Sequence, residues 1–523
     1  MNRFIQKIKK RAVMIAGFSA MLFLCFFSSA QEPSAAKSPA NSVQAFQVDT
    51  AVDSAVDSAL KEDAREVSIK GCVTFSIYHS FDVQLAKLDL YVEETDLMYK
   101  EAVFDAFISG GANYTEDKLQ PLSVFAADDS QTNEYYVEVE KTLPTGTELS
   151  AKWSDTRFWS NNNSYTSKNP SHNAGLLFEA VQPVGKNFFG YVDRGKISLT
   201  RLAIESADFQ MKDTIETFIA KVEKLYWELV FAKRSLEIYT DMLERAKKLY
   251  ESDKKNFGIG MIEKVDLLNS EANVEKRKAE FVASENAYRR AEENLKLAMN
   301  LEEEKRIFPR ENLDFEYVGK KLQDCLMTAF EERQDYKIKK KDVDYMGLDL
   351  KIKANEKWPE IDLNASLSMN GVESKFNKAF GKTTVADNTY YYAGIEVVIP
   401  VENKEARAEY KRVEFEKEKA IVELKETERT IITEVGNAYR DVLTFQTSLQ
   451  YFGRAVELQT AKLAEEEKRF EYGRSSTKRI IDYQRDLLLA ELENAAFLLK
   501  HRQARVDLDK SMGTIYYKYE DLI

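Results

Sequence analysis

The sequence predicts a mostly helical protein with a smaller share of β-strand, built from two copies of a unit in which strands precede a long helical hairpin. Three observations support this prediction. A heptad pattern of apolar residues occurs twice, as in helices packed as a coiled coil. The two occurrences belong to a longer internal repeat. Proline, which breaks helix interiors, is absent between Pro183 and Pro309 and after Pro400.

The repeat aligns residues 226–300 with 439–513 without a gap, at an offset of 213, and upstream it pairs Cys72 with Cys325 at an offset of 253. Each heptad seam is spaced alternately by four and three residues, and every position is apolar or aromatic. The seam residues are Phe218, Val222, Leu225, Leu229, Ala232, Leu236, Tyr239 and Leu243, and then Ile431, Val435, Ala438, Val442, Phe445, Leu449, Phe452 and Val456. We therefore predict a first structural repeat over 66–310 and a second over 311–523.

The N-terminus is predicted to hold an export signal and a leader. Residues 1–30 combine a basic segment, a short apolar segment over Ala12–Phe27 and small residues before a cleavage site at Ala30. Residues 31–65 are rich in Ala, Ser and Val and are predicted to form a flexible leader. Lipid attachment at Cys25 is the alternative to simple cleavage. No later apolar run is long enough to span a membrane as a helix, so a spanning mature chain would have to use strands.

The remaining elements follow in chain order. In the first copy, a helix is predicted to precede strands at Asp105–Glu116, Glu134–Lys141, Thr147–Trp159 and Asn173–Pro183, followed by a helical hairpin over 186–302. In the second copy, a helix precedes strands at Glu360–Asn370 and Tyr390–Pro400, followed by a helical hairpin over 403–515. Within the hairpins, we predict helices over 193–256, 262–302 and 476–515, with turns at Phe257–Gly260 and Tyr472–Ser475. Exposed loops are predicted at Trp159–Asn169 and Gly371–Asn388, which are rich in Asn, Ser, Asp and Lys.

The composition argues against several functional classes. The net charge of −12 lacks the basic footprint that nucleic-acid binding requires. The three histidines, His79, His172 and His501, are scattered, and no catalytic or metal-binding spacing occurs, so we expect no enzyme activity, cofactor or metal. Cys72 and Cys325 match no metal or redox motif. Export would permit a disulfide between them, but two buried free thiols are the favoured interpretation.

Several motifs in the same order resemble the TolC family of bacterial outer-membrane efflux proteins, over about residues 66–515. In the second copy, a helix of the A…R.D type, a proline-led strand entry, a return strand that ends in proline and a glycine-led tip resemble the family pattern. These are AFEERQDY (329–336), WPEIDL (358–363), GIEVVIPV (394–401) and GRSSTKRIIDYQ (473–484). In the first copy, GMIEKVDLLNSE (260–271) occupies the matching tip.

The resemblance implies a homotrimer whose chains lend strands to one closed β-barrel in the outer membrane, while their coiled-coil hairpins form a tunnel in the periplasm. The protein would be a passive conduit to the exterior in a tripartite efflux or type I secretion system. It would work with a periplasmic adaptor and an inner-membrane pump, and contact outer-membrane lipid. Chains of this family usually supply four strands. The additional hairpin over 134–159 would either enlarge the barrel or fold outside it.

The resemblance also places function at the hairpin tips. The residues that match the family's periplasmic gate are Asp266, Asn269, Arg479 and Asp482. We expect them to form a mixed ring held by Asp266–Arg479 or Asp482–Arg479 ion pairs, the alternative being solvated turn charges. The residues that match the adaptor-docking turns are Gly258, Gly260, Met261, Gly473, Arg474 and Ser475. The alternative function is a periplasmic coiled-coil adaptor or scaffold without a barrel, although such proteins normally contain one hairpin.

Overall fold

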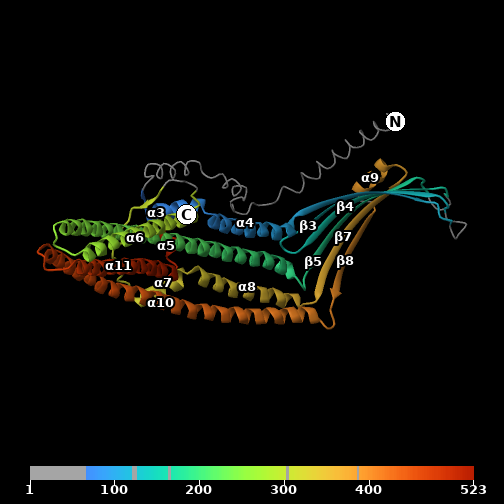
Figure 1. The fold of residues 1–523 in the computed structure, drawn as a ribbon. Coiled ribbons are helices and arrows are strands. Elements are labelled where there is room, and N and C mark those ends of the chain that lie inside the picture. Colours follow the sequence, from blue (N-terminus) through green and yellow to red (C-terminus); the bar gives the residue numbers. More distant parts are fainter. Residues whose placement is uncertain (1–65, 121–126, 163–166, 302–305, 386–387, 523) are drawn as a thin grey trace, which may run out of the picture. The chain divides into compact units, whose positions relative to one another are not determined.

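The computed structural model describes residues 66–120, 127–162, 167–301, 306–385 and 388–522 (Figure 1). The predicted signal over 1–30 and leader over 31–65 lie outside the described residues. None of the helices in the described ranges is both long and apolar enough to cross a membrane.

The first copy begins with β1 (Glu66–Val67), α3 (Ile69–His79) and α4 (Phe81–Glu101). The short helix η3 (Ala102–Phe104) leads to strands β2 (Ala106–Asp117), β3 (Ser130–Thr142), β4 (Glu148–Ser160) and β5 (Ser171–Pro183). Helix η4 (Phe188–Gly190) then leads to the long hairpin of α5 (Tyr191–Gly258) and α6 (Lys264–Ala298).

The second copy follows the same order with fewer strands. It comprises β6 (Phe308–Pro309), α7 (Leu322–Glu332), α8 (Gln334–Glu356), β7 (Glu360–Glu373), α9 (Phe376–Thr384) and β8 (Thr389–Val398). The hairpin of α10 (Lys404–Glu471) and α11 (Thr477–Ser511) comes next, and α12 (Ile515–Lys518) and η5 (Glu520–Leu522) end the described chain.

The long helices repeat with the offset of 213 seen in the sequence. Helices α5 and α10 each contain 68 residues, and α6 and α11 each contain 35. At a rise of about 1.5 Å per residue, a helix of this size extends about 100 Å. The predicted helical hairpins are therefore confirmed, and their boundaries lie within a few residues of those expected.

The heptad seams are buried or half-buried, as a coiled-coil interface requires. Val222, Leu229, Ile431 and Val435 are completely buried. Helix α5 also buries a second stripe that the seam does not include: Ile215, Ile219, Tyr226, Ile238 and Met242. The second stripe exists because α5 packs against α3, α4, α6, α8, α11 and α12, whereas the main helical neighbours of α10 are α7, α8 and α11.

Both copies contain a helix break at matching positions. Helix α3 gives way to α4 at Ser80, whose extended φ and ψ are −69° and 135°. Helix α7 gives way to α8 at Arg333, 253 residues later, where φ and ψ are −60° and 128°. Ser80 caps α4 through its side chain, whereas Arg333 forms ion pairs with Asp335 and Glu434 at 2.7 Å each. The paired cysteines of the repeat are buried free thiols, as expected.

The strands form one antiparallel sheet in the order β2-β3-β4-β5-β7-β8. All six predicted strands are present. Because the sheet is antiparallel, the strand ends that connect to α4, α5, α8 and α10 all lie at the same end of the sheet (Figure 1). A second sheet, the two-residue parallel pair of β1 and β6, was not predicted, because such short strands leave no periodic pattern.

The predicted exposed loop at Gly371–Asn388 is wrong in part. Strand β7 continues to Glu373, and α9 follows. Phe376, Ala379 and Phe380 have the spacing of one helix face, and α9 packs against β5 and β7. The polar composition of the segment hides this short amphipathic pattern.

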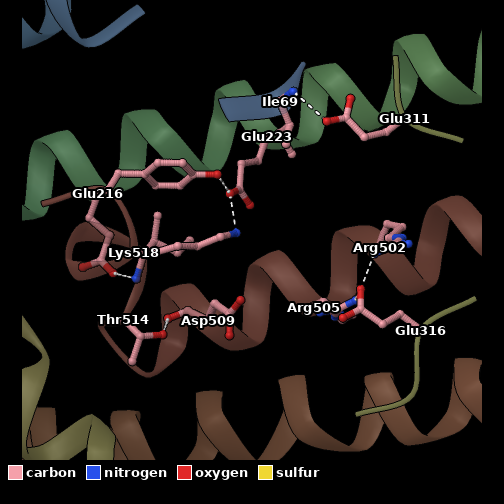
Figure 2. A network of polar contacts seen from close by, with 12 residues as sticks. Ile69, Glu216, Glu223, Glu311, Glu316, Arg502, Arg505, Asp509, Thr514 and Lys518 are labelled. Carbon is pink, nitrogen blue, oxygen red and sulfur yellow. Dashed lines mark hydrogen bonds and ion pairs between the residues drawn. The ribbon is translucent and has the colours of Figure 1, made fainter. Parts of the chain in front are cut away.

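A network of polar contacts ties the irregular connection after β6 and the C-terminal segment to α5 and α11 (Figure 2). Glu316 accepts hydrogen bonds from Arg505 and from Arg502, the latter at 2.8 Å. The Arg505 hydrogen bond is the main cause that lowers the pKa of Glu316 to about 2. Buried Glu223 accepts a hydrogen bond from Lys518 at 2.7 Å. These contacts hold two segments that lack long regular structure against the helical shaft.

Candidate functional site

The first candidate site is the sheet itself, whose two faces differ in chemistry. The register makes Val139, Ala151, Phe178 and Leu367 lateral neighbours on one face. We call this the apolar face. Its apolar members include Ile108, Tyr135, Val137, Val139, Leu149, Ala151, Trp153, Leu176, Phe178, Ala180, Leu363, Ala365, Leu367, Met369, Tyr391, Ala393, Ile395 and Val397.

The opposite face, which we call the polar face, carries mostly small polar and acidic residues. Its polar members in the middle of the strands are Ser109, Asn113, Thr115, Glu134, Glu138, Glu140, Ser150, Lys152, Ser154, Thr156, Asn173, Glu179, Asp362, Asn364, Ser366, Ser368, Asn370 and Glu396. Tyr136 and Leu177 are among the apolar residues that interrupt it. Lys152 is the one basic residue on this face within β2–β8, and it pairs with Glu138 at 3.1 Å.

The apolar face exposes many large apolar side chains, whose contact with water is unfavourable. Ile108, Tyr391 and Ile395 are each more than 60% exposed. Contiguous apolar surface of this kind marks contact with a membrane or a partner. Lys141, Arg157 and Glu373 of the apolar face lie toward the strand ends. Asp155, nearer the middle of β4, is an acid on the same face, and it is buried. The strands contain 10 to 14 residues, enough for the about 9–11 that a tilted strand needs to span a bilayer.

Helix α9 covers the apolar face near the strand ends that lie away from the long helices. The Phe376 ring lies 6.1 Å from the rings of both Trp153 and His172, which belong to the apolar face. Gly371 permits this contact, because a Cβ at that position would come within 2.2 Å of the Ala379 carbonyl oxygen. Beneath this end, His172 Nδ1 and Asp155 Oδ2 are 2.9 Å apart. The lysines of α9 are exposed, and Lys382 pairs with Glu373 of the apolar face at 2.6 Å.

The second candidate site is the pair of hairpin tips. In the first, α5 ends at Gly258, Gly260 adopts a left-handed φ of 78°, and α6 begins at Lys264. Met261 and Ile259 are each 71% exposed. In the second tip, Gly473 occupies the matching position with a φ of 63°, and Arg474 is exposed. Both turns therefore require the backbone freedom of glycine, as the sequence predicted.

The predicted gate residues lie at these tips, but the expected ion pairs do not form within one chain. Arg479 pairs with Glu466 at 3.3 Å, and Asp482 pairs with Arg485 at 3.3 Å. Asp266 lies half-buried in the first turn of α6, and Asn269 is exposed. Within the protomer, Arg479 and Asp482 thus pair with residues of their own hairpin and not with each other. A mixed ring between copies stays a prediction.

Two buried carboxylates behind the tips were missed by sequence reasoning. Asp253 on α5 is completely buried and accepts a hydrogen bond from the Thr477 hydroxyl of α11 at 3.2 Å. Burial, and less strongly the charge of Asp266, raises the pKa of Asp253. Glu466, 213 residues later, is also buried, but the Ser475 hydroxyl at 2.6 Å and then Arg479 lower its pKa. The two acids occupy the same position of the repeat, two helical turns before Gly260 and Gly473. This shared position is the sequence signal that could have indicated them.

The described residues contain no cluster of His, Cys, Asp and Glu suited to hold a metal ion. His501 is completely buried, with its ring 5.4 Å from that of Phe315. Burial, more than the neighbouring arginines, lowers the pKa of His501 to about 4.

Paired helical hairpins joined to a sheet with one apolar and one polar face define the class of outer-membrane channel proteins. The family model of the outer membrane efflux proteins matches this chain over residues 148–301 and 333–514, which lie in the two copies. The chain therefore belongs to the outer membrane efflux protein family. Members of this family are transport proteins. No curated protein sequence matches the chain.

Solved structures share the fold at low sequence identity. The Campylobacter jejuni CmeC outer membrane channel superposes with a TM-score of 0.62 at 12% identity, covering 87% of this chain and 89% of its own. The Vibrio cholerae outer membrane protein VceC gives 0.61 at 12% identity, covering 85% and 96%. The open state of the Neisseria gonorrhoeae MtrE outer membrane channel gives 0.62 at 14% identity, covering 85% and 88%. These likenesses concern the fold.

Proposed function

We propose that three copies of this chain form a passive conduit from the periplasm to the exterior, within a tripartite efflux or type I secretion system. The chain would be exported through a cleaved signal peptide, with the sheet in the outer membrane and the hairpins in the periplasm. The observation that supports the proposal is a sheet with one apolar and one polar face, which connects to both helical hairpins at the same end of its strands. An apolar face suits lipid, a polar face suits a water-filled lumen, and closure with neighbouring copies would pair the free edges of β2 and β8.

This proposal also assigns the partners. The exposed turns Gly258–Met261 and Gly473–Ser475 are proposed to receive a periplasmic adaptor, which would connect the channel to an inner-membrane pump that supplies the energy. Their exposed apolar side chains, such as Ile259 and Met261, suit a protein interface better than open solvent. No cofactor enters this function, and the lipid of the outer membrane surrounds the apolar face.

Membrane fractionation tests the conduit against the alternative of a periplasmic adaptor or scaffold. We expect the protein in the outer-membrane fraction, from which detergent extracts a trimer that conducts ions in a planar bilayer. An adaptor without a barrel would appear as a soluble or inner-membrane protein with no conductance. Recovery of a soluble monomer would contradict the proposed conduit.

The gate is proposed to lie at the tips, with the Asp266 and Asp482 carboxylates at its narrowest part and Asn269 and Arg479 beside them. Because Arg479 is engaged by buried Glu466, the Asp266 and Asp482 carboxylates would hold the closed state through ion pairs with basic residues of neighbouring copies. We expect the double variant Asp266→Asn and Asp482→Asn to raise single-channel conductance. Glu244→Gln, an exposed acid of α5 far from the tip, is the control. Unchanged conductance in the double variant would contradict this gate.

A further inference from the structure

We propose that the additional hairpin β3–β4 is part of the membrane-spanning wall, so that three copies close a barrel of eighteen strands around a wide, acidic lumen. This inference rests on the proposed function, from which it takes the trimer and the membrane location. It goes further by assigning the hairpin that the resemblance left open, and by naming the size and charge preference of the pore.

The first argument is the register of the hairpin. Strand β3 pairs with β2 without interruption from Ala106↔Lys141 to Asp117↔Ser130. Strand β4 pairs with β5 without interruption from Glu148↔Val181 to Phe158↔Ser171. The hairpin therefore separates β2 from β5 over almost its whole length. A hairpin folded outside the wall would leave β2 and β5 to pair with each other, and they do not.

The second argument is that the hairpin carries the same two faces as the rest of the sheet. Val137 and Val139 are exposed on the apolar face, at 43% and 39%. Between them and beside them, three carboxylates project to the polar face. We call these the hairpin acids: Glu134, Glu138 and Glu140. Alternation of this kind, here between Val137 and Glu140, is what a strand between lipid and water requires, whereas an external loop in water has no need of an apolar face.

The third argument is that the hairpin is fixed at its base. Its turn lies at the end of the sheet that connects to the long helices. There the Leu143 N–H donates a hydrogen bond to the Thr147 carbonyl at 2.8 Å. Gly146, with a φ of 70°, lies so close to Gly190 that an added Cβ would be 2.6 Å from the Gly190 nitrogen. The Thr147 hydroxyl donates to Gln182 of β5 at 2.5 Å. The turn is therefore packed where β5 leads into α5, and does not project freely.

The size of the pore follows from the strand count. Three copies of the six-stranded sheet give eighteen strands, where four strands from each chain would give twelve. With strands about 4.8 Å apart and tilted by about 40°, the backbone radius would be about 18 Å for eighteen strands and about 12 Å for twelve. Barrels of 16–18 strands leave an aqueous channel. The acids of the polar face, opposed only by Lys152 within the strands, would make that channel favour cations.

Single-cysteine labelling in membranes tests this placement. Val139→Cys and Glu140→Cys place thiols on the two faces of the hairpin, and Leu367→Cys and Ser368→Cys do the same for β7 at the same level of the sheet. A charged, membrane-impermeant maleimide should label the polar-face thiol of each pair roughly tenfold faster or more, because lipid excludes the reagent and suppresses the reactive thiolate. The unsubstituted protein, with buried Cys72 and Cys325, is the blank.

The two pairs separate failure of this inference from failure of the proposed function. Alternating labelling in both pairs supports the eighteen-stranded wall. Alternation at 367 and 368 with equal labelling at 139 and 140 would place the hairpin outside the wall, overturning the inference while the conduit stands. Equal labelling in both pairs would overturn the conduit as well. Val137→Cys and Glu134→Cys form a second hairpin pair, which decides the matter if a first variant does not reach the membrane.

Discussion

Glu216 on α5 gives the sharpest prediction about stability. Its buried side chain accepts a hydrogen bond from the backbone N–H of Ile515, at the start of α12, at 3.0 Å. Burial is the main cause that raises its pKa from 4.5 to about 7, while the backbone hydrogen bonds and Arg333 act in the opposite direction. The folded protein thus holds a proton at Glu216 that the unfolded chain loses at lower pH.

The sign and size of the effect follow from this difference. Between pH 4.5 and about 7, the folded state binds more protons than the unfolded state, so the free energy of unfolding falls as the pH rises. A pKa rise of this size corresponds to a loss of about 3 kcal/mol per protomer, complete above the folded pKa. Glu216→Gln keeps an oxygen acceptor for Ile515 but cannot ionise. We therefore expect the variant to lack this loss.

The effect is measured by urea unfolding at about pH 5 and about pH 8, followed by the circular dichroism of the helices. The change in the free energy of unfolding between the two pH values is then compared between the parent and the variant. The stability lost by the parent protein between the two values should exceed the loss in Glu216→Gln by about 2.5 kcal/mol per protomer. Glu244→Gln, which removes an exposed acid of the same helix, should retain the parent's pH dependence. If Glu216→Gln shows the same pH dependence as the parent, the raised pKa is refuted.

Other predictions concern the pore, the tips and α9. Changing the three hairpin acids to Gln should lower the cation-to-anion permeability ratio, measured as a reversal potential in a salt gradient; an unchanged potential would exclude them from the lumen. Gly260→Ala should destabilise the first tip by ~1–2 kcal/mol in urea unfolding, because a Cβ disfavours its φ of 78°, whereas Gly258→Ala, in open space within the helix, should not. Gly371→Ala should displace α9 and speed tryptic cleavage at Lys378. The control Gly381→Ala, also in open space, should leave cleavage unchanged.

The regular parts of the fold could be predicted because each depends on a local pattern. Four heptads and proline-free stretches predict α5 and α10, and alternation predicts the strands. The second buried stripe of α5, represented by Ile215 and Met242, could not be predicted in the same way. It depends on which helices surround α5, and that is decided by contacts between residues far apart in the chain.

The candidate site was predicted only in location. Glycines at positive φ fixed the tips, because few other residues adopt that backbone conformation. The contacts of the tip charges within the protomer were not predicted: Arg479 reaches Glu466, thirteen residues earlier in the chain and across the turn. Charged side chains are long, and several acids lie within reach of each arginine, so motif matching alone does not choose among them. Helix α9 was missed because most of its residues are polar, and only a few apolar residues contact the sheet.

The unequal number of strands in the two copies bears on how such a protein can change in evolution. The hairpin helices repeat residue for residue in length, yet the first copy lends four strands to the six-stranded sheet and the second copy only two. Inserting β3 and β4 moves β5 sideways by two strand spacings, about 10 Å, and the turn at Gly146 joins the widened edge to the start of α5. The number of strands in the sheet can therefore change without a change in the length of the hairpin helices. A lineage could alter the width of the sheet by gaining or losing one hairpin, without redesigning the helical shaft or the tips at its far end.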